Sequence, residues 1–299
     1  MQRLRNCPIC KNFRKNTIFL KENIKKSEIN KFSFSSRKIP EFMNFELVKC
    51  EKCSLIFANK IPNYKKIRKL YNETDFVSEQ DALDASQTYF EYLKRNLRLK
   101  IRNNALEIGT GSGIFLYYLK KLGFVKVVGV EPSKKAINLA DKEIKKKIHN
   151  GMFEEAKVKK NFFDLICCFM TMEHVYNPNK TLAKSYLSLK KGGNIAIVTH
   201  DSGNILHKIL GKKSPIIDIE HLQLFSKESI TFALKNNGFT NIKIIDIKNS
   251  YHLNYWINLL PISKVIKNIF QIFFKKYFKI LNIKLSFNVG NILIIGEKK

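Results

Sequence analysis

Ten residues near the middle of the chain, 104–113, constrain its fold more than any other stretch: Asn-Ala-Leu-Glu-Ile-Gly-Thr-Gly-Ser-Gly. A short apolar run contains the acid Glu107, and glycines follow at alternate positions. Residues 114–122 have the composition of a helix, and Gly123 is placed to end it. The order predicts a buried strand, a tight turn and a helix. Glycine lets a ligand lie directly against the backbone, where the helix N-terminus presents free N–H groups.

Two kinds of nucleotide-binding loop use glycines in this way. The dinucleotide fingerprint is G-x-G-x-x-G, and counting from Gly109 would put its third glycine at Ile114. The spacing found is E-x-G-x-G-x-G, which resembles motif I of the class I S-adenosylmethionine (SAM) methyltransferases. A second apolar run, 125–130, ends in Glu131, which could accept hydrogen bonds from both hydroxyls of a ribose. The loop and this acid together favour a nucleoside site over a turn that serves only packing.

Order and spacing from residue 54 to the C-terminus are similar to that family. The strand 162–170, the turn at Lys191-Gly192-Gly193 and the paired strands 241–248 and 291–298 match its later elements. The resemblance implies an α/β fold, with a Rossmann-like sheet of seven strands whose last strand inserts antiparallel. It also implies SAM as cofactor, bound by Glu107, Gly109, Thr110, Gly111, Gly113, Glu131, Phe153 and Met170. Phe153 could pack against the adenine ring or could equally be an ordinary core residue.

Four of the six cysteines form two C-x-x-C pairs near the N-terminus, Cys7 with Cys10 and Cys50 with Cys53. Four thiolates suit a closed, tetrahedral, structural Zn²⁺ site. The pairs lie further apart than in a usual zinc ribbon, so residues 11–49 are expected to form an extended hairpin or to carry an irregular insertion. A redox motif would need only one pair. Because no signal peptide is seen, we expect a cytoplasmic location with reduced thiols.

Two units are therefore predicted: a zinc-ribbon-like module over residues 1–60 and a SAM-dependent methyltransferase domain over residues 61–299. Residues 54–78 are expected to be a connector between them. The whole chain resembles bacterial methyltransferases with an N-terminal four-cysteine module, a group that includes enzymes acting on sugar nucleotides and surface-polysaccharide precursors. The resemblance implies a small-molecule acceptor, first of all a hydroxyl of a nucleotide-sugar. Related deoxysugar C-methyltransferases carry a further C-terminal domain for which this chain has no room, so C-methylation of a keto-sugar is not expected.

The sulfonium of SAM already activates its methyl group, so a hydroxyl acceptor needs alignment and a general base. Three histidines lie just after the predicted fourth and fifth strands or in the loop beyond the fifth strand. They are His174, His200 and His221. That edge of an open α/β sheet is where ligands bind. The family resemblance places a Glu-His pair near the acceptor. We therefore expect His221 to be the base, Glu220 to orient it, and His174 to be the second candidate.

Residues 252–285 separate the last two predicted strands. From 262 to 281 apolar residues recur at helical spacing with lysines on the opposite face, which predicts a basic amphipathic helix. Such a helix could lie on an anionic membrane, close over the site as a lid, or pack on the sheet. No run reaches the roughly 20 apolar residues of a membrane span. Peripheral membrane association through 262–281 is thus left open.

The formal net charge of +29 suits an acidic partner, such as nucleic acid, an anionic membrane or a phosphorylated substrate. Lysine, asparagine and isoleucine are spread along the whole chain, and a biased genome composition would give the same pattern. Two other functions stay open: an RNA base methyltransferase, which the charge fits, and a lipid or quinone O-methyltransferase at a membrane surface. RNA is the less expected, because Met170-Thr171-Met172-Glu173 stands where an N-P-P-[YF] loop would be. A non-enzymatic scaffold is the least expected, and the sequence does not set the oligomeric state.

Overall fold

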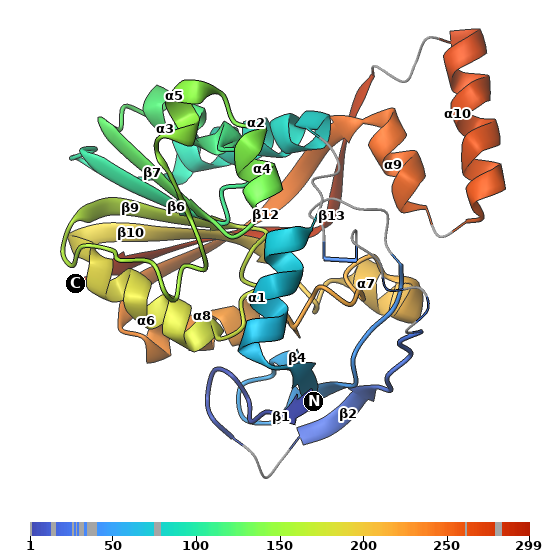
Figure 1. The fold of residues 1–299 in the computed structure, drawn as a ribbon, viewed down its shortest axis with the longest axis horizontal. Helices are drawn as coiled ribbons and strands as arrows, with labels where there is room; N and C mark the ends of the chain where they lie inside the picture. The colour runs from blue at the N-terminus through green and yellow to red at the C-terminus, as the bar shows by residue number, and fades with distance from the viewer. Residues whose placement is uncertain are drawn as a thin grey trace.

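The fold is taken from a computed structural model, which describes residues 2–12, 16–25, 27, 29, 33–34, 41–74, 79–260, 262–278 and 283–299. Figure 1 shows a central twisted sheet with helices on both faces, a small N-terminal module below it and a pair of helices projecting at one side. The sheet has seven strands in the order β12-β13-β10-β9-β6-β7-β8. Their bounds are β6 (Asn104–Ile108), β7 (Lys126–Glu131), β8 (Ile148–Asn150), β9 (Phe163–Phe169), β10 (Leu189–His200), β12 (Phe239–His252) and β13 (Lys284–Lys298).

The sheet is parallel except at its last strand. β13 pairs antiparallel with β10 on one side and with β12 on the other. The pairs β6–β7, β7–β8, β6–β9 and β9–β10 are parallel. The predicted α/β class, the seven strands and the antiparallel insertion of the last strand are therefore confirmed.

Both faces of the sheet are buried, which explains why its strands read as continuous apolar runs. In β9, Leu165 and Cys167 pack into one core, whereas Ile166 and Cys168 pack into the other. The first core is closed by α2 (Glu79–Asn96) and α3 (Ile114–Lys121), and the second by α6 (Pro178–Ser188) and α8 (Lys227–Asn236). Cys167 and Cys168 are thus small core residues.

Local capping residues fix where several helices begin. Ser226 caps α8, accepting a hydrogen bond from the backbone N–H of Ser229. Ser133 caps α4 (Lys134–Asn138) in the same way. The lysine-rich segment that follows is not a continuation of this helix, because Asp141 caps a separate helix, α5 (Lys142–Lys145). A second cap inside the segment competes with helix extension.

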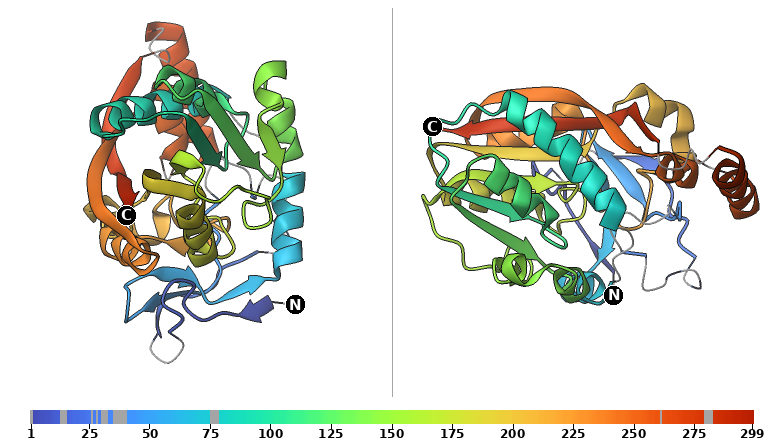
Figure 2. Two further views of the ribbon diagram at one scale, coloured as in Figure 1. Left: turned by 90° about the vertical axis from the view of Figure 1, so that its left-hand side faces the viewer. Right: turned by 90° about the horizontal axis from the view of Figure 1, so that it is seen from above.

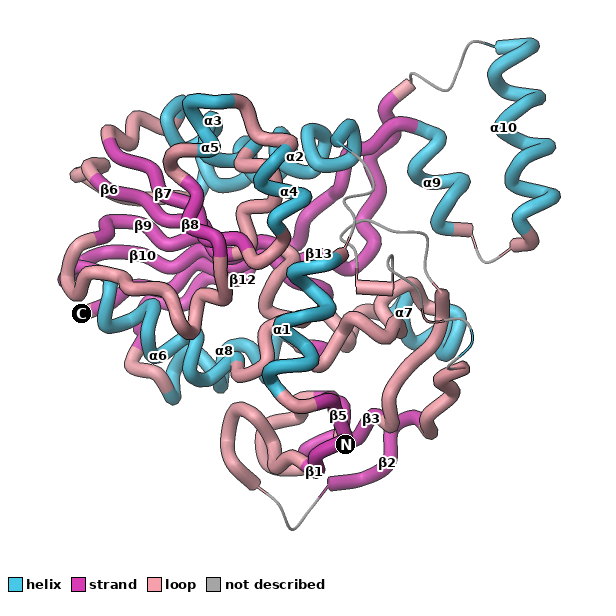
Figure 3. The backbone as a smooth tube through the Cα atoms, viewed as in Figure 1, coloured by secondary structure: helices cyan, strands magenta, loops and turns pink. Residues whose placement is uncertain are grey.

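The N-terminal module is built from two small sheets (Figure 3). In the first, β1 (Gln2–Leu4) pairs with β5 (Lys60–Pro62). The second has the order β11-β4-β3-β2, with β2 (Asn16–Leu20), β3 (Leu47–Cys50), β4 (Ile56–Ala58) and β11 (Gln223–Leu224). Residues 54–78 are not the connector that was predicted, because they contain β4, β5 and α1 (Tyr64–Glu73). Much of the segment between the cysteine pairs lies outside the described residues.

Two helices stand between β12 and β13: α9 (Leu253–Leu259) and α10 (Lys264–Phe278). Both flanking strands are longer than predicted, because they continue pairing beyond the sheet, with Tyr251 opposite Leu285. Figure 2 shows α10 projecting from the body of the molecule. The predicted helical residues 279–281 lie outside the described part of the chain. Among the described helices, none combines the length and apolar character needed to cross a bilayer.

Candidate functional site

A cavity of about 550 Å³ extends along the carboxyl edge of the sheet. At one end it is lined by the glycine loop after β6 and by Glu131 at the end of β7. Its middle is lined by residues after β9 and β10 and by residues of the segment between α7 (Ile205–Leu210) and β11. A short 3₁₀ turn, Gly211–Lys213, follows α7 in this segment. The other end of the cavity is lined by α9 and β13. The cavity therefore joins the predicted cofactor residues to the predicted catalytic residues.

The three loop glycines all adopt the left-handed conformation, with φ of 73°, 57° and 77° at Gly109, Gly111 and Gly113. Gly109 and Gly111 line the cavity, whereas Gly113 does not. A Cβ at Gly113 would collide with Ile144 of α5, so this glycine allows close packing of α3 against a neighbouring helix. A Cβ at Gly109 would collide with Thr171, which follows β9.

The acids near this loop are fixed by the backbone. The carboxylate of Glu131 accepts a hydrogen bond from the Gly111 N–H at 2.8 Å and another from the Ser133 N–H at 2.8 Å. Glu131 lines the cavity, and a carboxylate oxygen has two lone pairs and can accept more than one hydrogen bond. Thr110 donates its hydroxyl to Glu107. The hydroxyl of Ser112, which also lines the cavity, is buried without a hydrogen-bond partner among the described residues, as a ligand-binding group would be.

Phe153 and Met170 line the cavity as well. Phe153 is 3% exposed and packs in the core, so both interpretations given above apply to it. Met170 has a φ of 46° just after β9, and its N–H donates to Val198 O at 2.8 Å. A left-handed methionine is uncommon, and such backbone outliers cluster at functional sites.

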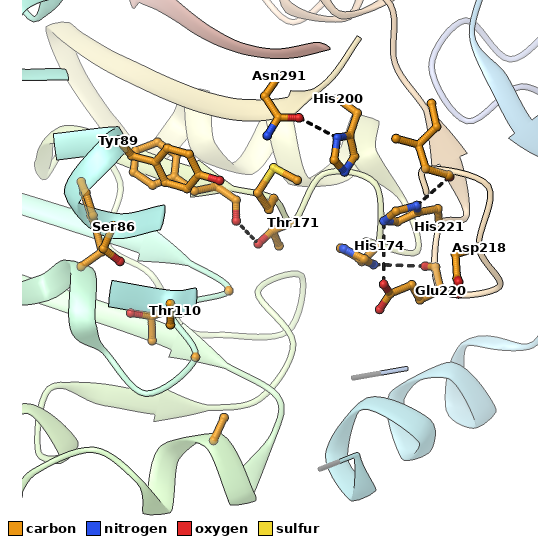
Figure 4. A pocket seen from close by; sticks show the side chains of 18 of the residues that line it. Ser86, Tyr89, Thr110, Thr171, His174, His200, Asp218, Glu220, His221 and Asn291 are labelled. Carbon is orange, nitrogen blue, oxygen red and sulfur yellow. Dashed lines mark hydrogen bonds and ion pairs between the residues drawn. The ribbon is translucent and has the colours of Figure 1, made fainter. Parts of the chain in front are cut away.

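The three histidines of the carboxyl edge meet in the middle of the cavity (Figure 4). The ring centroids of His174 and His221 are 4.8 Å apart, and those of His200 and His221 are 5.6 Å apart. Nδ1 of His221 lies 2.8 Å from Ile216 O, and Nδ1 of His174 lies 3.2 Å from Glu220 O. A carbonyl can only accept, so both Nδ1 atoms carry a proton, and in the neutral form of each ring Nε2 has the lone pair.

Glu220 lies beside both of these histidines. Its Oε1 is 3.9 Å from Nε2 of His221, and its backbone carbonyl holds His174. One donor atom from each of His174, Glu220 and His221 lies within 4.8 Å of the others, so the group could also hold a divalent cation. The structure therefore brings all three predicted catalytic residues together.

Gln223 ties the loops of the two histidines to each other. Its side-chain amide lies 2.7 Å from Met172 O, 3.1 Å from Glu173 O and 2.9 Å from Val175 O. Those carbonyls belong to the loop that carries His174, and His221 is two residues before Gln223 in the chain. The distance between the two imidazoles is thus held by one buried amide.

Burial favours the uncharged form of two histidines in the cavity lining, His200 and His207. It lowers the pKa of His200 well below 6.5, with His221 and His207 adding a smaller effect of the same sign. It also lowers the pKa of His207 to about 4. Among the described residues, the cavity lining contains no lysine or arginine and five carboxyl groups, those of Glu107, Glu131, Glu154, Asp218 and Glu220. Burial raises the pKa of Glu154.

Two asparagines belong to the site although the sequence motifs do not identify them. Asn291 accepts from Nδ1 of His200 at 2.7 Å. Asn249 is 2% exposed, lines the cavity, and its Oδ1 has no hydrogen-bond partner among the described residues. β12 and β13 contain several other polar residues, such as Asp246 and Lys248, so no signal in the sequence singles out these two asparagines.

The four cysteines of the N-terminal module also meet. Sγ of Cys7 is 3.5 Å from that of Cys53, and Sγ of Cys10 is 3.5 Å from that of Cys50. The hydrogen bond from Cys53 lowers the pKa of the Cys7 thiol to about 5. The four sulfurs lie within 4.8 Å of one another.

The two cysteine loops have the same geometry. Lys11, which follows the first pair, has a φ of 62° and donates its N–H to Cys7 O at 3.0 Å. Ser54, which follows the second, has a φ of 58° and donates its N–H to Cys50 O at 2.8 Å. Two matching knuckles that direct four thiols at one point fit a tetrahedral Zn²⁺ ion.

Comparison with solved structures agrees with this fold. A SAM-dependent methyltransferase from Thermotoga maritima is 21% identical, with 73% of this chain and 92% of that chain covered and a TM-score of 0.50. The YcgJ protein from Bacillus subtilis is 17% identical, with 70% and 97% covered and a TM-score of 0.53.

Comparison of sequences identifies the family. The ubiquinone biosynthesis O-methyltransferase of Dictyostelium discoideum mitochondria is 30% identical over 135 residues, which are 39% of this chain and 41% of that protein. The match thus spans less than half of that relative. The family described as methyltransferase domain matches residues 82–244, more than half of the chain. The chain therefore belongs to the family of SAM-dependent methyltransferases.

Proposed function

We propose that the protein transfers a methyl group from SAM to a hydroxyl of a small-molecule acceptor, with His221 as general base. The observation that supports this most is the single cavity that connects the glycine loop and Glu131 to three imidazoles. A methyl donor and an acceptor bound in one such cavity could react without leaving it.

The residues at the glycine-loop end fit SAM. Glu131 would accept from the ribose hydroxyls, Ser112 would gain the hydrogen-bond partner it lacks among the described residues, and the backbone at Gly111 would lie against the ligand. SAM supplies a methyl group already activated by its sulfonium. The chain has to align the acceptor, exclude water and remove one proton.

The proton of the acceptor hydroxyl would pass to Nε2 of His221. This atom is available because Ile216 O holds the proton of the ring on Nδ1. Glu220 is close enough to stabilise the imidazolium that forms. His174, held in the same tautomer, is the second base, and Asn249 Oδ1 offers a further acceptor for the substrate hydroxyl.

The charge of the cavity argues against a nucleotide-sugar, the acceptor first expected. A diphosphate at the acceptor end of the cavity would lie near the carboxylates of Asp218 and Glu220, which would repel it strongly in a partly buried site. The same carboxylates would repel the phosphate groups of RNA. An acceptor without phosphate at its reacting end fits better, which favours the lipid or quinone alternative. The relative named as a ubiquinone O-methyltransferase supports the same choice.

We also propose that residues 1–60 form a module held by one structural Zn²⁺ ion at Cys7, Cys10, Cys50 and Cys53, and that residues 61–299 form the methyltransferase domain with an insertion over about 252–285. The matching knuckles and the closely placed sulfurs support the metal site. Four sulfur donors leave no open coordination position, so this Zn²⁺ would not take part in the reaction.

Methyl transfer to a panel of uncharged phenols and alcohols, with nucleotide-sugars as the competing panel, tests the proposal. His221→Ala should lower turnover about a hundred-fold or more while SAM affinity stays unchanged. His149→Ala is the control, because His149 is exposed on β8 and does not line the cavity. Full activity of His221→Ala would contradict the role of the base, and transfer confined to nucleotide-sugars would contradict the choice of an acceptor without phosphate.

A further inference from the structure

The insertion between β12 and β13 exposes an unusually apolar helix. On α10, Val265 is 68% exposed, Ile269 60% and Ile272 65%, and these residues form one stripe at helical spacing. A neighbouring stripe, also exposed, consists of Ile266, Phe270 and Phe273. Figures 1 and 2 show that α10 stands away from the sheet, beside α9. Contiguous apolar surface of this kind marks an interaction site.

The charge around this surface specifies the partner. Residues 247–296 contain seven lysines and no arginine, aspartate or glutamate. Lys284 pairs with Asp84 of α2, and Lys267 is buried and donates to Asn258 O. The segment still has no acid of its own, so its net charge is positive and an anionic surface would complement it. An exposed apolar helix within a basic segment is the combination that binds the interface of an anionic bilayer.

The cavity reaches the same insertion. Tyr255, Trp256, Leu259 and Leu260 of α9 and its C-terminal end line its far end, opposite Phe287 of β13. Trp256 packs edge-on against Phe287 with centroids 5.0 Å apart, and its Nε1 donates to Leu285 O at 3.0 Å. Leu260 lines the cavity and is also 44% exposed, so the apolar end of the cavity lies at the protein surface.

We infer that α9 and α10 dock on an anionic lipid bilayer and that the acceptor is an amphiphile drawn from it. Its hydroxylated head would lie among His174, His200 and His221, and its apolar tail would lie along Trp256 and Leu259 toward the bilayer. This inference rests on the proposed function, and it names the acceptor class and the place where the enzyme meets it. Polar groups near the histidines and apolar groups near α9 match the two ends of such a molecule.

Flotation with lipid vesicles tests the docking. The protein should float with vesicles of equal parts phosphatidylglycerol and phosphatidylcholine, and should stay unbound with phosphatidylcholine alone. Ile269→Asp should weaken binding about tenfold or more, because it places a charge at the apolar contact. Val125→Asp is the matched control, since Val125 is 74% exposed and lies just before β7, away from α10. No flotation, or equal flotation with both kinds of vesicle, would overturn the docking. Association of two copies that Ile269→Asp abolishes would show that α10 is covered by a second chain instead.

Trp256 reports on the cavity directly, because it is the only tryptophan of the chain. Acyl chains brominated near the headgroup should quench its fluorescence in anionic vesicles. In a series of phenols with alkyl chains of increasing length, affinity followed by the same signal should rise about fourfold per methylene. A flat series would overturn the amphiphile. Calorimetry with SAM needs neither probe, so a protein that binds SAM but not vesicles would contradict only this inference. A protein that binds vesicles but not SAM would contradict the proposed function and the acceptor with it, and would leave the docking of α9 and α10 standing.

Discussion

The guanidinium of Arg5 donates a hydrogen bond to the side-chain oxygen of Gln223 at 3.3 Å, across 218 residues of sequence. Arg5 also donates to Tyr176 O and Leu222 O. It stands two residues before Cys7, and Gln223 stands two residues after His221. In addition, β11 completes the small sheet of the N-terminal module, with Gln223 opposite Phe57. The cysteine module is therefore joined to the loops that carry the candidate base.

Arg5→Met should disturb the acceptor end of the cavity and spare the cofactor end. The variant loses three hydrogen bonds that hold both histidine loops, so we expect kcat/KM to fall about tenfold while SAM affinity is unchanged. Steady-state kinetics and calorimetry measure the two effects. Arg68→Met is the control, because Arg68 forms an exposed ion pair with Glu155. If both variants had the same kinetics, the link between module and base would have no catalytic role.

This link could not be predicted from the sequence. The strand–loop–helix of residues 104–122, Glu131 and the cap at Ser226 follow from local rules, because each signal lies within a few residues. The two-residue strand β11 has no periodicity to detect, and it forms only because β4 offers an edge. The break between α4 and α5 depends on one aspartate cap inside a lysine-rich run.

In the candidate site too, only the residues that a local signal marks could be predicted. Residues in a motif or directly after a strand, such as His174 and His221, could be assigned to the carboxyl edge. Asn249 and Asn291 could not, because their place depends on the register of β12 and β13, in which Ile247 lies opposite Asn291 and Asn249 opposite Phe287. A one-residue change of register would turn either side chain to the other face of the sheet.

Metal analysis should find one Zn²⁺ ion per chain in protein purified under reducing conditions. Cys50→Ser should lose it, because three thiolates and a hydroxyl bind Zn²⁺ far more weakly. Cys168→Ala should keep it, since Cys168 is buried in β9. We expect Cys50→Ser to bind SAM with parental affinity but to lose turnover. Stoichiometric metal in Cys50→Ser would instead place an ion elsewhere, and His174, Glu220 and His221 are the other group of donors among the described residues.

Glu131→Ala should weaken SAM binding by about ten- to a hundred-fold, since it removes the two oxygens assigned to the ribose. Part of the loss would arise because the backbone N–H groups of Gly111 and Ser133 donate hydrogen bonds to these oxygens and would lose them. Glu155→Ala is a matched control at a half-exposed surface glutamate. Isothermal titration calorimetry gives both dissociation constants. Unchanged affinity in Glu131→Ala would show that the ribose lies elsewhere.

Stability should fall as the pH falls below about 6.5, partly because of His207. Burial, opposed by Asp201, lowers the pKa of this histidine to about 4 in the folded protein. The unfolded chain therefore binds a proton that the folded chain does not, and one histidine contributes a slope of up to about 1.4 kcal/mol per pH unit until about pH 4. In urea unfolding between pH 5 and 7, His207→Gln should flatten this dependence by that amount. The exposed control His149→Gln should not, and equal slopes in the two variants would contradict the assignment.

Calorimetric titration of SAM into two glycine variants tests the central claim most directly. Gly111 and Gly192 both have a positive φ, 57° and 76°, so valine strains the backbone at either position. Only Gly111 lines the cavity, whereas a Cβ at Gly192 would have no atom within 4 Å. The parent protein and Gly192→Val should bind SAM with the same micromolar-range affinity, and Gly111→Val should not bind it measurably. If Gly111→Val bound SAM as tightly as Gly192→Val, the cofactor would not lie against this loop, and the assignment of the cavity would be wrong.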